Sequence, residues 1–366
     1  MNDLFEPYDL GVLHLRNRIV MAPMTRARNP DGIPNALNAL YYQQRAGAGL
    51  IITEGTPISK TAEGFVFIPG LYTSAQVAGW RAVTQAVHAQ GGAIFTQLWH
   101  VGRVSHVSNQ PGGIAPVSST AQIAKASQAW GFLADGSAGP VDVSAPRALS
   151  TAEVRGVIRD FAVAAERAIE AGFDGIELHG ANGYLIEQFL NPLVNDRTDE
   201  YRSDTIENRS RFLLETVAAV ADRIGADRTA VRLSPYGGLF DMGLYDDVDK
   251  TYLHLADELS KFNLAYVHLM DQQSRGSTPI PASFLPQFRL RYRGTLILAG
   301  GMTRAHAERC IQEGLIDLAA FGEPFIANPD LVERLRNGWP LEKADRSRSF
   351  GGGAEGYTDY QVYQPA

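Results

Sequence analysis

The sequence predicts an α/β fold: a (β/α)8 TIM barrel with an N-terminal hairpin and a long excursion after the third strand, in one domain over residues 1–366. Eight short apolar segments, typical of buried parallel strands, alternate along the chain with longer segments of helical periodicity. A doubly wound sheet is the alternative fold. That sheet would require a glycine-rich dinucleotide turn after an early strand, and none is found there.

The predicted strands are short runs rich in Val, Ile, Leu and Phe. They cover 18–23, 49–53, 93–98, 175–179, 230–234, 265–270, 295–300 and 318–322. Helices are predicted over 74–90, 151–171, 206–224, 248–262, 303–313 and 328–337. The pattern is clearest at 151–171, where Val154, Ile158 and Phe161 share one helix face. Ser150 and Glu153 form a capping box at its start.

Two further segments complete the predicted barrel. Residues 4–16 are expected to form a hairpin that closes the bottom of the barrel. The segment 100–149 is rich in Gly, Pro and Ser and is too long for an ordinary loop. We therefore expect it to cross the barrel mouth.

Composition restricts the class of function. A net charge of -7 argues against a nucleic-acid binder, which needs a basic face. No apolar run is long enough to span a membrane, and no secretory signal is seen at the start. Cys310 is the only cysteine, which excludes an intrachain disulfide and fits a reducing compartment. We expect a cytoplasmic protein that acts on a small molecule.

The C-terminal ends of barrel strands meet at one face, where barrel enzymes place their active sites. The residues expected at this face combine hydrogen-bond donors, one strong cation, an aromatic ring and several glycines. They are Pro23, Met24, Thr25, Gly55, Gln97, Trp99, His179, Arg232, Gly300, Gly301 and Gly322. Glycines after the seventh and eighth strands suit a phosphate, because backbone N–H groups can approach an anion there.

The order of residues along the fourth strand adds a further expectation. Glu177 and His179 are two apart, so both side chains face the same side of the strand. If His179 faces the mouth, Glu177 lies inside the barrel, where an unpaired carboxylate is costly. Arg232 on the next strand is a candidate partner for it.

Six sequence motifs resemble the old yellow enzyme family, which are FMN-dependent ene-reductases. The motifs are APMTR at 22–26, QLWHVGR at 97–103, ELHGANGYLIEQFLNP at 177–192, AVRLSP at 230–235, FG-PFIANPDL at 321–331 and GGGAEGYTDY at 351–360. They occur in order across nearly the whole chain. The resemblance implies one FMN-binding barrel that reduces the C=C bond of α,β-unsaturated carbonyl or nitro compounds. Reduction of nitro groups or nitrate esters is also compatible with it.

The resemblance implies catalytic roles for three residues. His179 and Asn182 would donate hydrogen bonds to the activating oxygen of the substrate, and Tyr184 would protonate the α-carbon. If 180–189 coils into a helix, His179 and Asn182 lie about one turn apart and can converge. A phenol is protonated at neutral pH, which suits Tyr184 to the role of an acid.

The resemblance also implies flavin contacts. Thr25 would bond the edge of the isoalloxazine ring near O4, Gln97 the pyrimidine edge, and Arg232 the region of N1 and O2. Pro23, Met24, Gly55, Gly300, Gly301, Gly322 and Glu323 would complete the cofactor site, while Thr25, Trp99 and Tyr357 would line the substrate side. NADPH, or NADH, would reduce the flavin at the same face, and hydride would pass through flavin N5 in a ping-pong cycle.

One position departs from the family pattern. Members usually carry Arg or Lys directly after the FG of the eighth strand, where it meets the FMN phosphate, and this chain has Glu323. A carboxylate would repel a phosphate. We therefore predict that Glu323 turns away and that backbone N–H groups near Gly301 and Gly322 hold the phosphate.

Other functions of a barrel remain alternatives. A Schiff-base aldolase needs a lysine at a strand end, and none of the five lysines (60, 125, 250, 261 and 343) ends a predicted strand. A metal hydrolase would need an early H-x-H or clustered carboxylates, so no metal is expected. A flavin-binding barrel without activity would not need His179, Asn182 and Tyr184 together. Taken singly, His179 could be a core histidine and Arg232 a structural ion-pair partner.

Overall fold

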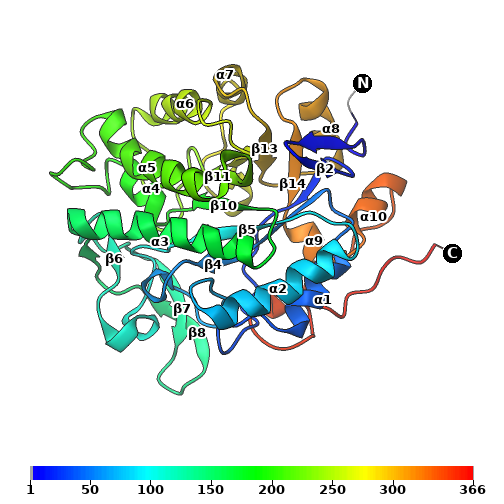
Figure 1. Ribbon diagram of the computed structural model, residues 1–366, viewed down its shortest axis with the longest axis horizontal. Coiled ribbons are helices and arrows are strands. Elements are labelled where there is room, and N and C mark those ends of the chain that lie inside the picture. The colour runs from blue at the N-terminus through cyan, green and yellow to red at the C-terminus, as the bar shows by residue number, and fades with distance from the viewer. Residues whose placement is uncertain (1–2, 366) are drawn as a thin grey trace.

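The computed structural model describes residues 3–365 and forms a closed barrel of eight parallel strands surrounded by helices (Figure 1). The barrel strands, in chain order, are β3 (Ile19–Met21), β4 (Leu50–Pro57), β5 (Ile94–Trp99), β10 (Gly175–Gly180), β11 (Thr229–Leu233), β12 (Tyr266–Met270), β13 (Leu296–Ala299) and β14 (Leu318–Phe321). Pairing of β14 with β3 closes the ring. Every predicted strand is found, so the predicted fold class is confirmed.

Ten helices are formed by the described residues. They are α1 (Ala36–Gln44), α2 (Ser74–His88), α3 (Thr151–Glu170), α4 (Leu185–Leu190), α5 (Ile206–Ile224), α6 (Val248–Leu259), α7 (Phe284–Arg291), α8 (Arg304–Gln312), α9 (Glu323–Ala327) and α10 (Leu331–Asn337). The six predicted helices are confirmed as α2, α3, α5, α6, α8 and α10. The helices α1, α4, α7 and α9 are additional to the predicted set.

Two apolar layers hold the barrel together, and they arise from the alternation of side chains along each strand. On β4, Leu50 and Ile52 belong to the cluster inside the barrel, together with Phe95. Ile51, between them, belongs to the larger cluster between strands and helices. Strands buried on both faces are therefore mainly apolar, which explains their clear signal in the sequence.

The N-terminal hairpin closes the bottom of the barrel, as predicted. Strands β1 (Tyr8–Leu10) and β2 (Leu13–Leu15) pair antiparallel, and Leu10 and Leu15 join the cluster inside the barrel. The Tyr8 hydroxyl lies 2.7 Å from the Thr295 hydroxyl, directly before β13.

The excursion after β5 lies over the other end, also as predicted. It contains the hairpin of β7 (Gln128–Phe132) and β8 (Ala138–Asp142), and the short parallel pair β6 (Val117–Ser118) and β9 (Arg147–Ala148). Ala129 and Val143 of this segment pack in one cluster with Trp99 and Tyr184. The excursion thus encloses the C-terminal ends of the strands on one side.

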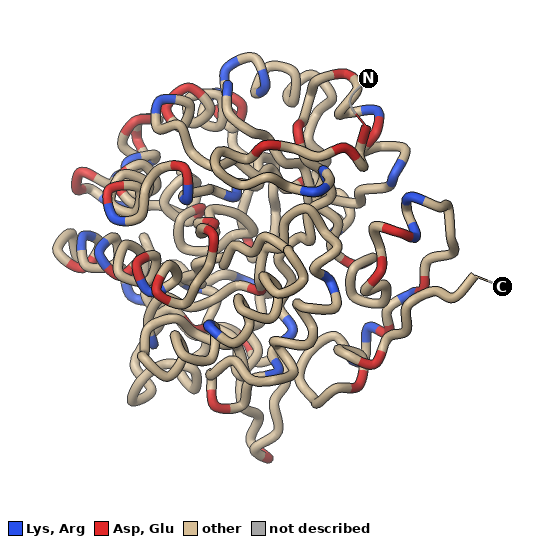
Figure 2. Tube along the Cα trace, turned by 45° about the vertical axis from the view of Figure 1, so that its right-hand side comes forward, with Lys and Arg blue, Asp and Glu red and all other residues tan. Residues whose placement is uncertain are grey.

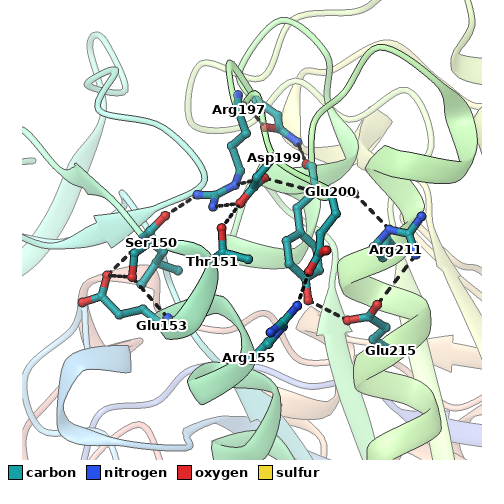
Figure 3. A network of polar contacts seen from close by, with 12 residues as sticks. Ser150, Thr151, Glu153, Arg155, Arg197, Asp199, Glu200, Arg211 and Glu215 are labelled. Carbon is teal, nitrogen blue, oxygen red and sulfur yellow. Dashed lines mark hydrogen bonds and ion pairs between the residues drawn. The ribbon is translucent and has the colours of Figure 1, made fainter.

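A polar network ties the segment after α4 to the outer helices (Figure 3). Arg197 pairs with Asp199, and Asp199 also accepts a hydrogen bond of 2.6 Å from Thr151 at the start of α3. The Tyr201 hydroxyl donates to Glu215 of α5 at 2.7 Å. The network therefore fixes the chain that follows α4.

Acidic and basic residues are interspersed over the outer helices (Figure 2). Among residues 3–365, no helix has the length and apolar character needed to cross a bilayer. The same residues contain no group of three or more His, Cys, Asp or Glu side chains arranged to hold a metal ion.

Candidate active site

The site is built around the turn that joins β10 to α4. His179 lies at the end of β10, and Tyr184 is the N-cap of α4. Between them, Asn182 (φ 60°) and Gly183 (φ 78°) are left-handed. The prediction of a helix from residue 180 is therefore wrong, because Asn and Gly adopt left-handed backbone readily and the turn's N–H groups bond to side chains instead.

Two side-chain contacts hold this turn. The Asn182 N–H donates to the Ser234 hydroxyl at 2.8 Å, and the Gly183 N–H donates to the Glu187 carboxylate at 2.6 Å. Ser234 in turn donates to Glu187, with distances of 3.0 and 3.1 Å to its two oxygens. The left-handed turn, rather than a helical repeat, therefore sets the position of Asn182.

Three predicted site residues form one aromatic cluster. The rings of His179 and Tyr184 are 5.0 Å apart, and Trp99 lies 4.8 Å from Tyr184 and 6.0 Å from His179. A Cβ atom at Gly55 would lie 2.4 Å from the Trp99 indole, so this glycine makes room for the ring. His179, Tyr184 and Trp99 are 4%, 7% and 2% exposed.

The protonation of His179 follows from its surroundings. Burial, together with the Arg232 charge, lowers its pKa well below the ordinary value, so the ring is neutral at pH 7. The Ala181 N–H donates to Nδ1 at 3.4 Å. Since Nδ1 accepts, the ring proton resides on Nε2, and His179 presents a hydrogen-bond donor.

Tyr184 is suited to proton donation. Burial raises its pKa above the ordinary value of a phenol, and the nearby Arg275 charge offsets only part of this effect. Its hydroxyl is therefore protonated at neutral pH and available as an acid.

Arg232 is a buried cation at the same end of the barrel. Burial lowers its pKa to about 10, which leaves the guanidinium charged at neutral pH. One terminal nitrogen contacts the Met270 sulfur at 3.3 Å. Within residues 3–365 its Nε has no hydrogen-bond partner and the side chain forms no ion pair. A buried charge of this kind requires an acceptor.

Glu177 lies inside the barrel, as predicted, but its partner is not Arg232. Its carboxylate lies 2.8 Å from Nδ1 of His268 and accepts a bond of 2.7 Å from Gln97. Arg232 is in register with His179, nearer the mouth, so it does not reach Glu177 directly. Burial raises the pKa of Glu177, but its contacts with His268 and Gln97 and the Arg232 charge outweigh burial and hold it below the ordinary value.

This contact orients the amide of Gln97. An ionised carboxylate only accepts hydrogen bonds, so Nε2 of Gln97 must face Glu177. The amide oxygen then faces away from Glu177 as an acceptor. Gln97 itself is 2% exposed, so its orientation is fixed by packing as well.

The predicted phosphate region has close backbone approaches. Gly300 and Gly301 have φ values of 118° and 61°. A Cβ atom at Gly300 would lie 2.1 Å from the Asp271 carbonyl oxygen, so only glycine fits. Gly322 lies beside Met24, and Pro23, Met24 and Thr25 follow β3 as a half-buried segment.

Glu323 is the first residue of α9, and its side chain is 59% exposed and lies 3.3 Å from Arg346 of the C-terminal tail. The carboxylate thus faces solvent and a cation. This placement agrees with the expectation that Glu323 turns outward.

Residues 3–342 match the NADH:flavin oxidoreductase / NADH oxidase family. The chain belongs to this family. Putative 12-oxophytodienoate reductase 11 of Oryza sativa subsp. japonica is 42% identical, with 98% of this chain and 96% of the relative covered. For 12-oxophytodienoate reductase 2 of Arabidopsis thaliana the identity is 40%, with 98% and 95% covered.

Solved structures agree with this assignment. Morphinone reductase is 46% identical with a TM-score of 0.97, covering 99% of this chain and 97% of that one. It has also been solved in complex with tetrahydroNAD. An old yellow enzyme homologue from Zymomonas mobilis is 37% identical with a TM-score of 0.91, covering 99% and 100%. The resemblance to old yellow enzyme is confirmed, and the protein is an oxidoreductase of an FMN-binding family.

The residues of this family member fit FMN. Arg232 supplies a buried cation that lacks an ion-pair partner among the described residues, and Gln97 an amide of fixed orientation. Gly300, Gly301 and Gly322 leave the backbone open to close approach. These groups would hold the ring and the phosphate.

Tyr357 does not lie where the family resemblance placed it. Its ring is 0% exposed and stacks on Tyr41 at 4.1 Å, and its hydroxyl accepts from Asn38 at 3.1 Å. Arg26 and Arg28 lie over its ring. Tyr357 therefore anchors the tail under the loop after β3 rather than lining the substrate side. Phe350, which packs on Trp130 of the excursion, is the exposed aromatic residue of this tail.

Sequence reasoning assigned no role to Glu54, Glu187 or Gln272. Glu54 accepts hydrogen bonds from the Arg26 and Ala27 N–H groups at 2.9 and 3.1 Å, so it holds the loop that carries Thr25. The signal available for Glu54 was a carboxylate inside an apolar strand. Glu187 accepts the Gly183 N–H and Gln272 donates to Asn182, and no pattern in the sequence indicates either contact.

Proposed function

We propose that this family member is an FMN-dependent, NAD(P)H-driven reductase of C=C bonds activated by a carbonyl or nitro group. The observation that carries the proposal is the grouping of His179, Asn182 and Tyr184 at the end of β10. Two hydrogen-bond donors and one protonated phenol there match the needs of conjugate reduction. Relatives named for reduction of 12-oxophytodienoate and morphinone support the same class.

In this proposal His179 and Asn182 bind the activating oxygen of the substrate. Their hydrogen bonds strengthen as negative charge develops on that oxygen, which lowers the barrier to attack at the β-carbon. FMN, when bound, supplies the hydride, with NADPH or NADH as its reductant. Tyr184 then delivers its proton to the α-carbon.

Arg232 and Gln97 support this chemistry from the other side of the site. The Arg232 charge would stabilise negative charge on the pyrimidine edge of the flavin, and Gln97 would accept a hydrogen bond from it. Closure by the excursion after β5 would keep water from the reacting atoms.

The first test is the visible spectrum of the purified protein before and after anaerobic addition of NADPH. We expect flavin absorption that bleaches with NADPH and returns when 2-cyclohexenone is added. Absorption that bleaches but does not return would contradict the proposed substrate class. A protein that neither carries nor takes up FMN would contradict the whole proposal.

A further inference from the structure

Asn182 can serve as a donor only if its amide faces the right way, and a neighbouring residue decides this. Gln272 is 1% exposed, directly after β12, and its Nε2 donates to Oδ1 of Asn182 at 3.0 Å. With Oδ1 engaged by Gln272, the Asn182 NH2 group is on the opposite side of the amide.

The orientation of Gln272 is itself fixed. Its Oε1 accepts the Gly238 N–H at 3.1 Å and the Ser277 hydroxyl at 3.1 Å. The Gly238 N–H also donates to the Ser277 hydroxyl at 3.3 Å, so it is shared between the two oxygens. A backbone N–H can only donate, so the Gln272 oxygen faces Gly238 and its nitrogen faces Asn182. The Gly238 N–H therefore orients the Gln272 amide, and the Gln272 amide in turn orients the Asn182 amide.

Packing confirms that space is reserved for this amide. A Cβ atom at Gly237 would lie 2.7, 2.9 and 3.0 Å from Nε2, Cδ and Oε1 of Gln272. Gly237 does not have a positive φ, so its small size, rather than its backbone freedom, is what this position requires.

We propose that Gln272 is a positioning residue that locks the Asn182 amide with its NH2 group toward the substrate oxygen. The inference rests on the proposed function. Gln272 makes Asn182 a donor without touching the substrate. When Gln272 cannot donate, the Asn182 amide can turn its oxygen toward the substrate, where two acceptors would repel each other.

The orientation of Asn182 by Gln272 should contribute more to the affinity for a ligand with an anionic oxygen than for one with a neutral oxygen. A hydrogen bond to a charged acceptor is stronger than one to a ketone. Loss of the lock should therefore weaken binding of a phenolate, which resembles an enolate, more than binding of cyclohexanone. General loosening of the site would weaken both ligands equally.

The test measures dissociation constants of 4-hydroxybenzaldehyde, as its phenolate, and of cyclohexanone, by perturbation of the flavin spectrum. Gln272→Met keeps the length of the side chain but removes its donor and acceptor. We expect phenolate binding to weaken about tenfold and cyclohexanone binding by less than about threefold. Gly237→Ala should give the same pattern, because its methyl group displaces the Gln272 amide. Gln273→Met, an exposed position in the same loop, is the matched control.

Equal weakening of both ligands in both variants, or no weakening of either, would overturn the role of Gln272. The measurement is valid where the variants retain FMN, and Gly237→Ala provides a second route if Gln272→Met folds poorly. A wild-type protein that binds neither ligand, or lacks flavin, would instead contradict the proposed function. The two failures are therefore distinguishable.

Discussion

At the scale of single residues, the proposed acid Tyr184 depends on the position and protonation of one hydroxyl group. Its ring is packed between Trp99 and Phe240, with centroids at 4.8 and 5.3 Å. This packing leaves the side chain little freedom, so the acidic proton is held at a defined place. Burial ensures that the hydroxyl is protonated.

We predict that Tyr184→Phe lowers kcat for reduction of 2-cyclohexenone by about 10²–10⁴-fold, the usual contribution of a positioned acid. The dissociation constant for the enone should change by less than about threefold, because the hydrogen bonds of His179 and Asn182 remain. Steady-state kinetics and spectral titration measure the two quantities. Tyr292→Phe, at a buried tyrosine outside the site, is the control. A parallel loss of affinity would show that Tyr184 serves binding instead.

Glu187 is a buried carboxyl that accepts a hydrogen bond from the turn between β10 and α4, and its ionisation depends on pH. Burial raises its pKa to about 7, although the Gly183 N–H and the Tyr252 and Ser234 hydroxyls favour the ionised form. A folded-state pKa above the ordinary 4.5 means that the folded protein binds this proton more tightly than the unfolded chain. Its contribution to stability is present below about pH 4.5 and is lost as the pH rises through about 7.

This shift corresponds to about 3 kcal/mol of unfolding free energy between pH 5 and pH 8. We predict that Glu187→Gln removes this part of the pH dependence. Urea unfolding of wild type and variant at both pH values measures the difference. Exposed Glu170→Gln should keep the wild-type slope. An unchanged slope in Glu187→Gln would assign the pH dependence to other groups.

At the scale of elements, helix α9 begins with Glu323, where members of the family usually carry Arg or Lys. Glu323 is offset by Arg346, but both side chains are largely exposed, so water screens their attraction. A carboxylate in the first turn is favourable to the helix itself. It is unfavourable to a phosphate bound nearby.

We predict that Glu323→Arg lowers the dissociation constant of FMN about fivefold, the effect of a modest change in charge near a partly solvated anion. Titration of the protein stripped of FMN, followed by quenching of flavin fluorescence, measures it. Glu333→Arg on α10 carries the same change of charge away from the glycines. Unchanged or weaker FMN binding in Glu323→Arg would reject the assigned position of the phosphate.

In the network that joins α3 to the segment after α4, Asp199 accepts hydrogen bonds from Arg197 and Thr151. Burial raises the pKa of Asp199, but the bonds from Arg197 and Thr151 outweigh burial and lower it to about 2. Asp199 therefore stabilises the fold above about pH 4, and this stability is lost as the pH falls through about 2.

We predict that Asp199→Asn lowers the unfolding free energy at pH 7 by about 2 kcal/mol, and that the difference shrinks at pH 3. Urea unfolding at the two pH values measures it. Asp204→Asn, in an exposed pair with Arg202, provides the comparison. A difference independent of pH would indicate lost packing rather than lost charge.

At the scale of the whole molecule, the C-terminal tail returns to the first barrel strand. Arg26 donates to the Ser349 and Gly356 carbonyls at 3.0 and 2.7 Å. Arg28 donates to the carbonyls of Gly353 and Arg348 at 2.8 and 2.7 Å. The loop that carries Thr25 is therefore held from both ends of the chain.

We predict that truncation after Asp345 leaves these arginines without their acceptors and lowers the unfolding free energy by at least about 3 kcal/mol. The truncated protein should also lose FMN faster on dilution, because Thr25 adjoins Arg26. Thermal unfolding and flavin release measure the two effects. Truncation after Tyr363 should leave both unchanged. A stable truncated protein that keeps its flavin would show that the tail does not support the site.

The barrel and most of its mouth were predictable from sequence because each buried strand is a short apolar run with a polar or glycine end. Asn182 was assigned to the site, yet its left-handed turn was not foreseen, since Asn and Gly permit both hands. Tyr357 was misplaced because a motif does not say which face of a tail packs inward. Gln272 lies 90 residues from Asn182, so no local pattern connects them.

The two proposed oxygen-binding donors owe their polarity to the main chain. Ala181 N–H assigns the proton of His179, and Gly238 N–H, through Gln272, orients Asn182. A substitution changes the side chain at a position but keeps the backbone N–H group, unless the new residue is proline. Mutation can therefore reshape the loops around the mouth, and with them the choice of substrate, while the donor pair is kept as long as Gln272 is kept. Proline at position 181 or 238 would remove one of these two N–H donors.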